Sequence, residues 1–237
     1  KIKPDSPVLE EISLGLVSKE FKKIRHQTPM LSLDKCYNDE DLNDWAAKFE
    51  GNLVASPKID GCATELRYNE KGELVLGATR GDGIEGEEIT ANVRMISDIP
   101  QKIGPGPLEI RGEIYMSLSV FKTYQESFAN PRNLAAGAIK QKDPRKTREY
   151  RLSFFGYDVI GPQLKTEGEK FALLRSFRIP TVEMKRIKRE EMRSSYDYFL
   201  KKREEWDFET DGVVFKTDLV SEQERLGLTA HHPRFAI

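Results

Sequence analysis

The segment from residue 53 to residue 78 constrains the fold most, because its polarity alternates with the two-residue period of a β-strand. Glu65 and Arg67 alternate with less polar neighbours. The run Asn-Glu-Lys-Gly at 69–72 is a typical hairpin turn, and apolar residues recur at 74, 76 and 78 beyond it. A two-residue period indicates a strand with one buried face. We therefore expect an antiparallel pair over 62–78, preceded by a strand over 53–58.

Helical spacing of apolar residues marks several segments outside the strands. Asn38 precedes three acidic residues and an apolar stripe that includes Trp45, which predicts an N-capped amphipathic helix. Similar spacing from about residue 8 predicts a helix up to His26. Further strands are expected over 108–116, 152–160 and 212–216, and further helices over 117–127, 171–177 and 189–206. Strands in hairpins with helices between the groups predict an α+β fold with largely antiparallel sheets and flanking helices.

Composition excludes several classes of protein. The 237 residues carry 38 Lys+Arg against 39 Asp+Glu, and the net charge of −1 disfavours a wholly basic nucleic-acid binder while leaving room for a local basic face. No apolar run reaches the roughly 18–20 residues of a membrane span. Cys36 and Cys62 are too few for a disulfide framework or a zinc site, so we expect a cytoplasmic protein. The first residue, Lys1, and the apolar end at Ile237 suggest an excerpt from a longer chain.

The run Gly81–Gly86 matches the G-x-G-x-x-G pattern of dinucleotide-binding folds and makes a nicotinamide-dependent oxidoreductase a rival hypothesis. Asp98 even lies near the spacing of a ribose-binding acid. However, four acidic side chains between residues 82 and 88 would repel a pyrophosphate, and the preceding strand alternates instead of running apolar. A glycine-rich connection is therefore the favoured interpretation.

A second set of short motifs carries more chemical information. Lys58-Ile59-Asp60-Gly61 alone would be a surface turn. Its companions each place charged groups next to a strand end or a tight turn, where they can converge on a ligand. They are Thr79-Arg80-Gly81-Asp82-Gly83, Glu109-Ile110-Arg111-Gly112-Glu113, Phe128-Ala129-Asn130-Pro131-Arg132-Asn133 and Asp211-Gly212-Val213-Val214-Phe215-Lys216. The sequence contains no P-loop pattern, so a P-loop ATPase is not supported.

In this order, the motifs resemble the adenylation (nucleotidyltransferase) domain of bacterial NAD-dependent DNA ligases. The resemblance runs from about residue 4 to the C-terminus, and segments 26–33, 129–137 and 226–234 resemble the NAD-using branch specifically. It implies a nucleotidyltransferase fold of the ATP-grasp-like ligase kind. It also implies one domain over 1–237, with a helical lead-in over 1–50 packed on a core over 51–237. The family's NAD-gripping front subdomain and its oligonucleotide-binding, zinc, helix-hairpin-helix and terminal domains would lie outside this chain.

The resemblance implies that Lys58 attacks the α-phosphorus of NAD and forms a lysyl-adenylate, which then passes to the 5′-phosphate of a DNA nick. Asp60 and Asp211 would support the lysine, the nick phosphate or a Mg²⁺ ion. Arg80 and Lys216 are cationic candidates that would favour the neutral lysine. The residues expected around the nucleotide are Ser32 and Leu33 in the pocket wall, Ser56, Arg80 at the sugar–phosphate, Glu113 at the ribose, Tyr157 stacked on adenine and Lys216 at the adenine edge or phosphate.

Arg132, Lys140 and Arg145 fall where the resemblance implies contacts with DNA phosphates. Two residues depart from the family pattern: Ser56 stands where Glu is common, and Lys140 stands where Arg is usual. Two simpler interpretations stay open, because Tyr157 could be a core residue and Glu113 could pair with Arg111.

The expected partners are NAD, Mg²⁺ and nicked double-stranded DNA, with zinc only in the C-terminal part outside this chain. We expect a monomer that acts on DNA of the bacterial nucleoid and does not bind a membrane. We also expect that the isolated chain does not seal nicks by itself. Two related alternatives are an ATP-using covalent nucleotidyltransferase, disfavoured by the three NAD-branch segments, and a non-catalytic nucleotide- or DNA-binding paralogue, disfavoured by the intact motif residues.

Overall fold

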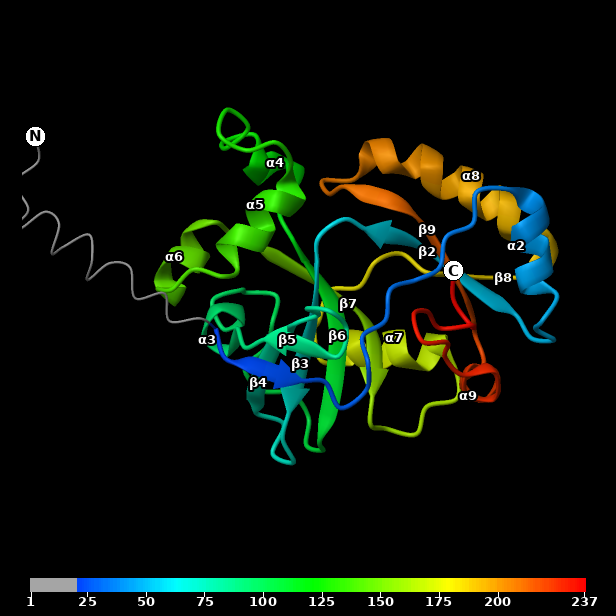
Figure 1. Ribbon diagram of the computed structural model, residues 1–237, viewed down its shortest axis with the longest axis horizontal. Coiled ribbons are helices and arrows are strands. Elements are labelled where there is room, and N and C mark those ends of the chain that lie inside the picture. Colours follow the sequence, from blue (N-terminus) through cyan, green and yellow to red (C-terminus); the bar gives the residue numbers. More distant parts are fainter. Residues whose placement is uncertain (1–20) are drawn as a thin grey trace, which may run out of the picture.

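The computed structural model describes residues 21–237, which form three antiparallel sheets with helices packed around them (Figure 1). The largest sheet has the order β4-β3-β6-β7. Its strands are β3 (Cys62–Tyr68), β4 (Leu74–Thr79), β6 (Leu108–Tyr115) and β7 (Ser153–Ile160). This sheet contains the predicted hairpin, since β3 and β4 pair across the turn at 69–72. The predicted strands over 62–68, 108–116 and 152–160 are confirmed.

A second sheet has three strands in the order β8-β2-β9. They are β8 (Lys185–Ile187), β2 (Leu53–Ile59) and β9 (Thr210–Thr217), and Figure 1 shows helices α2 (Asp39–Ala46) and α8 (Met192–Lys202) beside this sheet. The central strand β2 pairs with both neighbours in antiparallel register. A third, two-stranded sheet joins β1 (Lys23–Arg25) to β5 (Glu85–Glu87). The largely antiparallel α+β prediction is therefore correct.

Most helices start at side-chain caps that the sequence provides. The side chains of Asn38, Asn130 and Thr166 each accept a hydrogen bond from a backbone N–H three residues ahead, at the starts of α2, α5 (Pro131–Ala138) and α7 (Glu167–Ser176). The remaining helical elements are α3 (Thr90–Val93), α4 (Leu118–Phe121), α6 (Pro144–Glu149), α9 (Val220–Leu226), and the 3₁₀ turns η1 (Arg189–Glu191) and η2 (Arg203–Glu205). None of the helices in residues 21–237 is long and apolar enough to cross a membrane.

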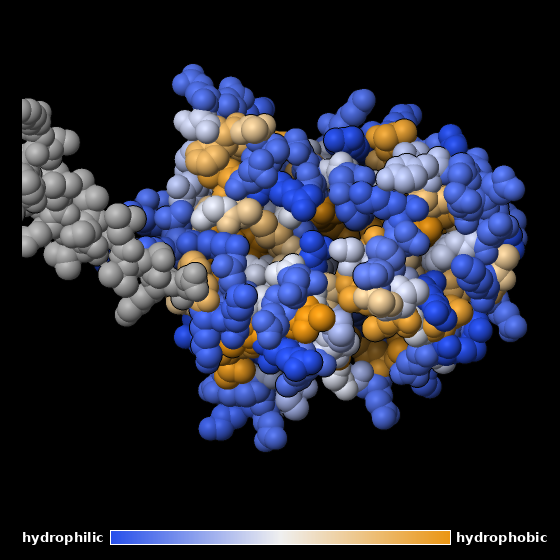
Figure 2. Space-filling view, in the orientation of Figure 1, coloured by the Kyte–Doolittle hydropathy of each residue, from blue (hydrophilic) through white to orange (hydrophobic). Residues whose placement is uncertain are grey.

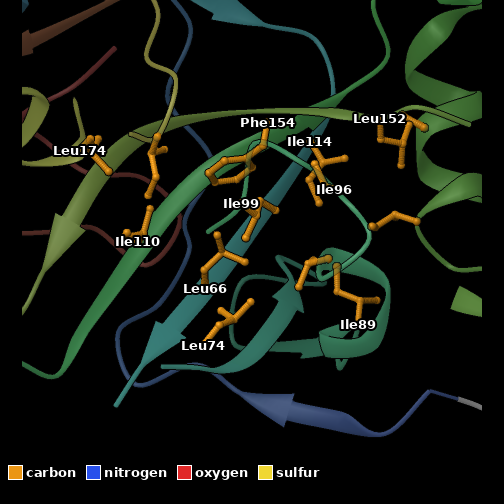
Figure 3. Packing of buried hydrophobic residues seen from close by; sticks show 14 of the residues in the cluster. Leu66, Leu74, Ile89, Ile96, Ile99, Ile110, Ile114, Leu152, Phe154 and Leu174 are labelled. Carbon is orange, nitrogen blue, oxygen red and sulfur yellow. The ribbon is translucent and has the colours of Figure 1, made fainter. Parts of the chain in front are cut away.

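Two apolar clusters stabilise the two main sheets. In Figure 3, Leu66, Ile110 and Phe154 point from neighbouring strands of the four-stranded sheet into one cluster with Ile89 and Ile96. The second cluster packs α2 and α8 on the three-stranded sheet and includes Trp45, Leu53, Phe199 and Phe215. Hydrophilic side chains cover most of the face shown in Figure 2. Each of the two main sheets thus has its own core.

Three sequence expectations differ from the structure. Residues 1–20 lie outside the described residues, and the helix expected up to His26 is wrong over its end, where Lys23–Arg25 form β1. Within the expected helical lead-in, only α2 is helical from residue 21 onward, because residues 27–37 are irregular. The helix expected over 117–127 is limited to Leu118–Phe121 and continues as turns.

The glycine-rich run Gly81–Gly86 connects β4 to β5, and Gly86 pairs with Ile24 in an antiparallel ladder. A dinucleotide fold instead requires a parallel strand that leads into a helix N-terminus. The next helix, α3, has only four residues and begins after β5. The oxidoreductase hypothesis is therefore wrong, and the run is the glycine-rich connection that its acidic residues favoured.

The link between the two main sheets is the two-residue step from β2 to β3, Asp60-Gly61. A Cβ atom on Gly61 would overlap the carbonyl oxygen of Ile114 on β6. We expect Gly61→Ala to lower the free energy of unfolding by at least about 2 kcal/mol, because the overlapping atom belongs to the backbone and cannot rotate away.

A matched control is Gly137→Ala in α5, where a Cβ would have no heavy atom within 4 Å. This change should raise the free energy of unfolding by about 0.5–1 kcal/mol, since alanine favours helix. Urea denaturation of both variants measures the difference. Equal stability of the two variants would contradict the close approach at Gly61.

Candidate active site

A cavity of about 530 Å³ lies between the three-stranded and four-stranded sheets. This volume falls in the range of about 300–1,000 Å³ that small-molecule sites occupy. The cavity is lined from one side by β2 and β9 and from the other by residues of β3, β6 and β7. Antiparallel pairing fixes which side chains face it, because residues two apart along a strand share a face.

Lys58 occupies one end of the cavity, near the end of β2. It lies opposite Gly212 of β9, and the register then shifts so that Ile59 lies opposite Thr210. Asp211 is thus the extra residue of a β-bulge, an irregularity that re-aims side chains. Lys58 Nζ donates to both carboxylate oxygens of Asp211, at 2.7 and 2.6 Å. With side chains 37% and 40% exposed, the pair is accessible to a ligand.

Further charged groups surround this end. Arg132, at the start of α5, donates from Nη1 to Asp60 Oδ1 at 2.9 Å. Lys140, which follows α5, forms an ion pair with Glu87 of β5. Arg80 Nη1 donates a hydrogen bond to Ser32 Oγ at 3.4 Å. Three cations therefore line the same cavity as Lys58, and they can stabilise the negative charge of a phosphate.

Glu113 reaches the cavity from β6. Burial raises the pKa of its carboxyl to about 8, although the nearby charges of Lys58, Arg80 and Arg132 act in the opposite direction. Glu113 is therefore protonated at neutral pH when no ligand is bound. A neutral carboxyl at this position can both donate and accept hydrogen bonds, which suits neighbouring hydroxyl groups.

Lys216 lies at the other end of the cavity. It faces Val54 of β2, four residues before Lys58, which corresponds to roughly 13 Å along an antiparallel strand. Its Nζ lies 2.9 Å from Glu167 Oε1 and 3.8 Å from Asp158 Oδ2. Lys170 forms ion pairs with the same two acids, at 2.9 Å to Glu167 and 2.7 Å to Asp158.

A row of buried charges on β3 and β6 supports the cavity wall. Arg111 lies opposite Glu65 and pairs with Glu109 at 2.7 Å. Its two terminal nitrogens donate to the carbonyls of Thr28 and Pro29, at 2.6 and 3.0 Å. The segment that leads to Ser32 and Leu33 is thereby fixed against the four-stranded sheet.

The family model of the NAD-dependent DNA ligase adenylation domain matches residues 18–237. The chain belongs to this family. It is 40% identical to a DNA ligase of Bradyrhizobium sp. (strain BTAi1 / ATCC BAA-1182) over 93% of its own length and 34% of that protein. It is 37% identical to a DNA ligase of Myxococcus xanthus (strain DK1622), over 99% of this chain and 38% of that protein. The chain thus spans about a third of the length of these relatives.

Among solved structures, an archaeal ATP-dependent RNA ligase matches with a TM-score of 0.50 and 17% identity, over 85% of this chain and 47% of that one. This likeness concerns the fold alone. It agrees with the nucleotidyltransferase fold expected from the sequence, and the adenylation-domain family is the assignment that the motifs implied.

Most of the residues expected at the adenylation site line the cavity. They are Ser32, Leu33, Ser56, Lys58, Asp60, Arg80, Glu113, Arg132, Lys140, Tyr157, Asp211 and Lys216. Arg145 lies elsewhere, because its side chain is 87% exposed and pairs with Asp143. Glu113 does not pair with Arg111, whose partner is Glu109. Lys216 was expected as a cationic neighbour of Lys58; its backbone lies four residues from Lys58 along the sheet, and its amino group pairs with Glu167, so this role stays a prediction.

Sequence reasoning missed the acids and the lysine around Lys216. Strand alternation would place Asp158 on the face opposite Tyr157, yet both line the cavity. The register of β6 and β7 shifts so that Gly112 faces Gly156 and Arg111 faces Asp158, which makes Tyr157 the extra residue of a bulge. Glu167 and Lys170 come from α7, where no motif marked them. A bulge has no dependable sequence signal, so this part of the adenylation site required the structure.

The expected Mg²⁺ site near Asp60 and Asp211 is not preformed. Each of these acids is paired with a cation, and residues 21–237 contain no group of three or more His, Cys, Asp or Glu side chains arranged to hold a metal ion. Mg²⁺ commonly binds through one or two carboxylates together with substrate phosphates. Mg²⁺ near Asp60 and Asp211 therefore stays a prediction.

The raised pKa of Glu113 predicts a specific pH dependence of stability. A carboxyl with a higher pKa in the folded protein binds more protons when folded, so stability falls as pH rises from about 4.5, its ordinary value, to about 8. Glu113→Gln removes this titration. The variant should match the parent below pH 4.5 and become progressively more stable than the parent up to about pH 8, as measured by urea denaturation across this range.

The same change at the exposed turn residue Glu70 controls for the loss of one surface charge. If the difference between the parent and Glu113→Gln stays constant with pH, Glu113 does not titrate in this range.

Proposed function

We propose that this domain transfers AMP from NAD to Lys58 and then to the 5′-phosphate of a DNA nick, as the adenylating part of an NAD-dependent DNA ligase. The observation that carries the proposal is the position of Lys58. Its amino group lies at the surface of a nucleotide-sized cavity, fixed by both oxygens of Asp211 and surrounded by Arg80, Arg132 and Lys140. A nucleophile held in place among fixed cations is the arrangement that phosphoryl transfer requires.

In the first step, Lys58 Nζ forms a bond to the α-phosphorus as the bond from that phosphorus to the oxygen of nicotinamide mononucleotide breaks. The leaving group departs with the electron pair of that bond. Lys58 must lose a proton, and the carboxylate of Asp211, already hydrogen-bonded to Nζ, is the group in place to accept it. Arg80, near the same end of the cavity, stabilises charge on the phosphate oxygens.

The two ends of the cavity support one orientation of the nucleotide. The phosphate belongs near Lys58 and the three cations, whereas the base belongs near Tyr157 and Lys216. Glu113 on β6 lines the same cavity and suits the ribose hydroxyls. The offset of about 13 Å between Lys58 and Lys216 along the sheet is comparable to the length of a nucleoside monophosphate.

We further propose that Arg132 and Lys140 bind the 5′-phosphate of the nick. Both line the cavity that contains Lys58. Each forms an ion pair with an acid, Arg132 with Asp60 and Lys140 with Glu87, and the phosphate would replace that acid as the partner. Arg145 on α6 would contact the DNA backbone farther away. The remaining proposals are that Mg²⁺ enters with the substrate phosphates, neutralising part of their charge, and that the protein acts as a monomer on DNA in the bacterial cytoplasm.

The central test is covalent labelling with NAD that carries the label in its adenylate half, in the presence of Mg²⁺. Because the NAD-gripping subdomain is expected outside this chain, the protein labelled is a chimera that carries residues 18–237 within the Myxococcus xanthus relative. We expect intact mass to show one AMP adduct, and peptide mapping to place it on Lys58. Lys58→Arg should abolish the adduct while leaving the circular dichroism spectrum unchanged, because arginine keeps its proton and cannot attack. The surface change Lys71→Arg is the matched control and should be labelled as the parent is.

Transfer to DNA is tested in a chimera that carries residues 18–237 in place of the matching segment of the Myxococcus xanthus relative. We expect nick sealing that depends on NAD, releases nicotinamide mononucleotide and disappears with Lys58→Arg. Sealing by the Lys58→Arg chimera, or equal sealing with ATP and release of pyrophosphate, would refute the proposal.

A further inference from the structure

The end of the cavity far from Lys58 combines apolar walls with a small set of charged groups. Phe171, Val182 and Met184 line this end together with Tyr157. A flat aromatic base fits between such side chains, since its faces are apolar and its edge is polar. The choice between bases therefore depends on the polar groups that meet the edge, and here these include Asp158.

One oxygen of the Asp158 carboxylate accepts hydrogen bonds from the protein, and the other remains available to a ligand. Oδ1 accepts hydrogen bonds from Lys170 Nζ at 2.7 Å and from the backbone N–H of Val159 at 2.9 Å. Within residues 21–237, the hydrogen bonds that this carboxylate accepts all end on Oδ1. Oδ2 lies 3.8 Å from Lys216 Nζ, beyond hydrogen-bond distance, and the side chain is 20% exposed.

Two neighbouring groups hold this arrangement in place. Glu167 is 1% exposed, and its Oε1 lies 2.9 Å from both Lys170 Nζ and Lys216 Nζ and accepts a hydrogen bond from Gln223 at 2.8 Å. Burial by itself would raise the pKa of Asp158, but the charges of Lys216 and Lys170 outweigh burial and hold it well below its usual range. Asp158 is therefore an ionised acceptor at neutral pH.

An acceptor at Asp158 Oδ2 and a donor at Lys216 Nζ thus lie next to each other at the base end. Adenine has the complementary edge, with an amino donor beside the N1 acceptor. A 6-oxopurine such as hypoxanthine or guanine has the reverse, with an oxygen acceptor beside an N1–H donor. Such a base would leave a charged carboxylate facing an oxygen, and unmatched buried polar groups discriminate strongly between ligands.

We propose that Asp158 is the residue that selects adenine, by accepting a hydrogen bond from its 6-amino group, and that Glu167 and Lys170 are positioning residues for this carboxylate. The inference rests on the proposed function for the orientation of the nucleotide. The residue that would distinguish adenine from other bases thus lies at the β-bulge of β7, on a different strand from Lys58 of β2.

Asp158→Asn tests this directly, because the surroundings dictate how the amide must lie. The two donors at the Oδ1 position require the amide oxygen there, so the NH₂ group must take the Oδ2 position and face the cavity. Calorimetry with AMP and inosine monophosphate measures the effect on the full chain. The parent should prefer AMP, and the variant should lose at least about tenfold of that preference.

Glu167→Gln is the matched control, since its amide oxygen can still accept from Lys170 and Lys216 and so keeps Asp158 in place, while one charge is removed from the same cluster. We expect the affinities of this variant for AMP and inosine monophosphate to change by the same factor, so that it keeps the parent's preference for AMP. If Asp158→Asn fails to fold by circular dichroism, the double variant Asp158→Asn with Lys170→Gln balances the lost carboxylate by removing the charge of a lysine that pairs with both acids, and should show the same loss of preference.

The inference is overturned if the parent binds both nucleotides equally, or if a folded variant with Asn at 158 keeps the parent's preference. A purely structural role of Asp158 would weaken both nucleotides equally and leave the ratio intact. Free mononucleotides require no reaction at Lys58, so a failure of adenylate transfer and a failure of base selection remain distinguishable.

Discussion

The site depends on one close approach, that of Gly61 to the backbone of Ile114. Only glycine fits there, because a Cβ would overlap the Ile114 carbonyl oxygen. The chain can therefore pass from β2 to β3 in the two residues Asp60-Gly61, and the end of one sheet is held against the start of the next. Lys58 then lies three residues before the crossing, while Glu113 precedes Ile114 on the opposite sheet. Lys58 and Glu113 face the same cavity for this reason.

Two β-bulges complete the chemistry of that cavity. One lies between β2 and β9 and turns Asp211 to Lys58, and the other lies between β6 and β7 and turns Asp158 to the same cavity as Tyr157. Regular alternation would give each strand one residue in two for the site. A bulge adds a second consecutive residue to the same face. In both cases the added residue allows a carboxylate to lie near a lysine, which fixes the lysine without a metal or a long loop.

Sequence patterns predicted the longer strands but neither the three-residue strands β1, β5 and β8 nor the bulges. The alternation of Glu65 and Arg67 and the turn at 69–72 predicted the β3–β4 pair, since burial of one face leaves a direct imprint on polarity. The motif residues predicted most of the cavity lining, because the family resemblance ties them to one site. Local patterns did not predict that Lys216 would lie beside Glu167, since that contact joins a strand to a helix through tertiary packing. The same holds for β1, whose pairing with β5 depends on residues more than 60 positions apart.

Charge pairing explains how a chain with a net charge of −1 can hold phosphates. At the mouth of the cavity, Arg132 is paired with Asp60 but is 51% exposed. Exposed pairs contribute about 0–1 kcal/mol, whereas hydrogen bonds to charged groups contribute about 1.5–3 kcal/mol, so an incoming phosphate can displace the acid. Lys216 is paired with the buried Glu167, and removing a partner from a buried ion pair costs about 3–5 kcal/mol. The pair at Arg132 is therefore the one that a phosphate of the proposed substrate can exchange, while the pair at Lys216 is held in place by burial.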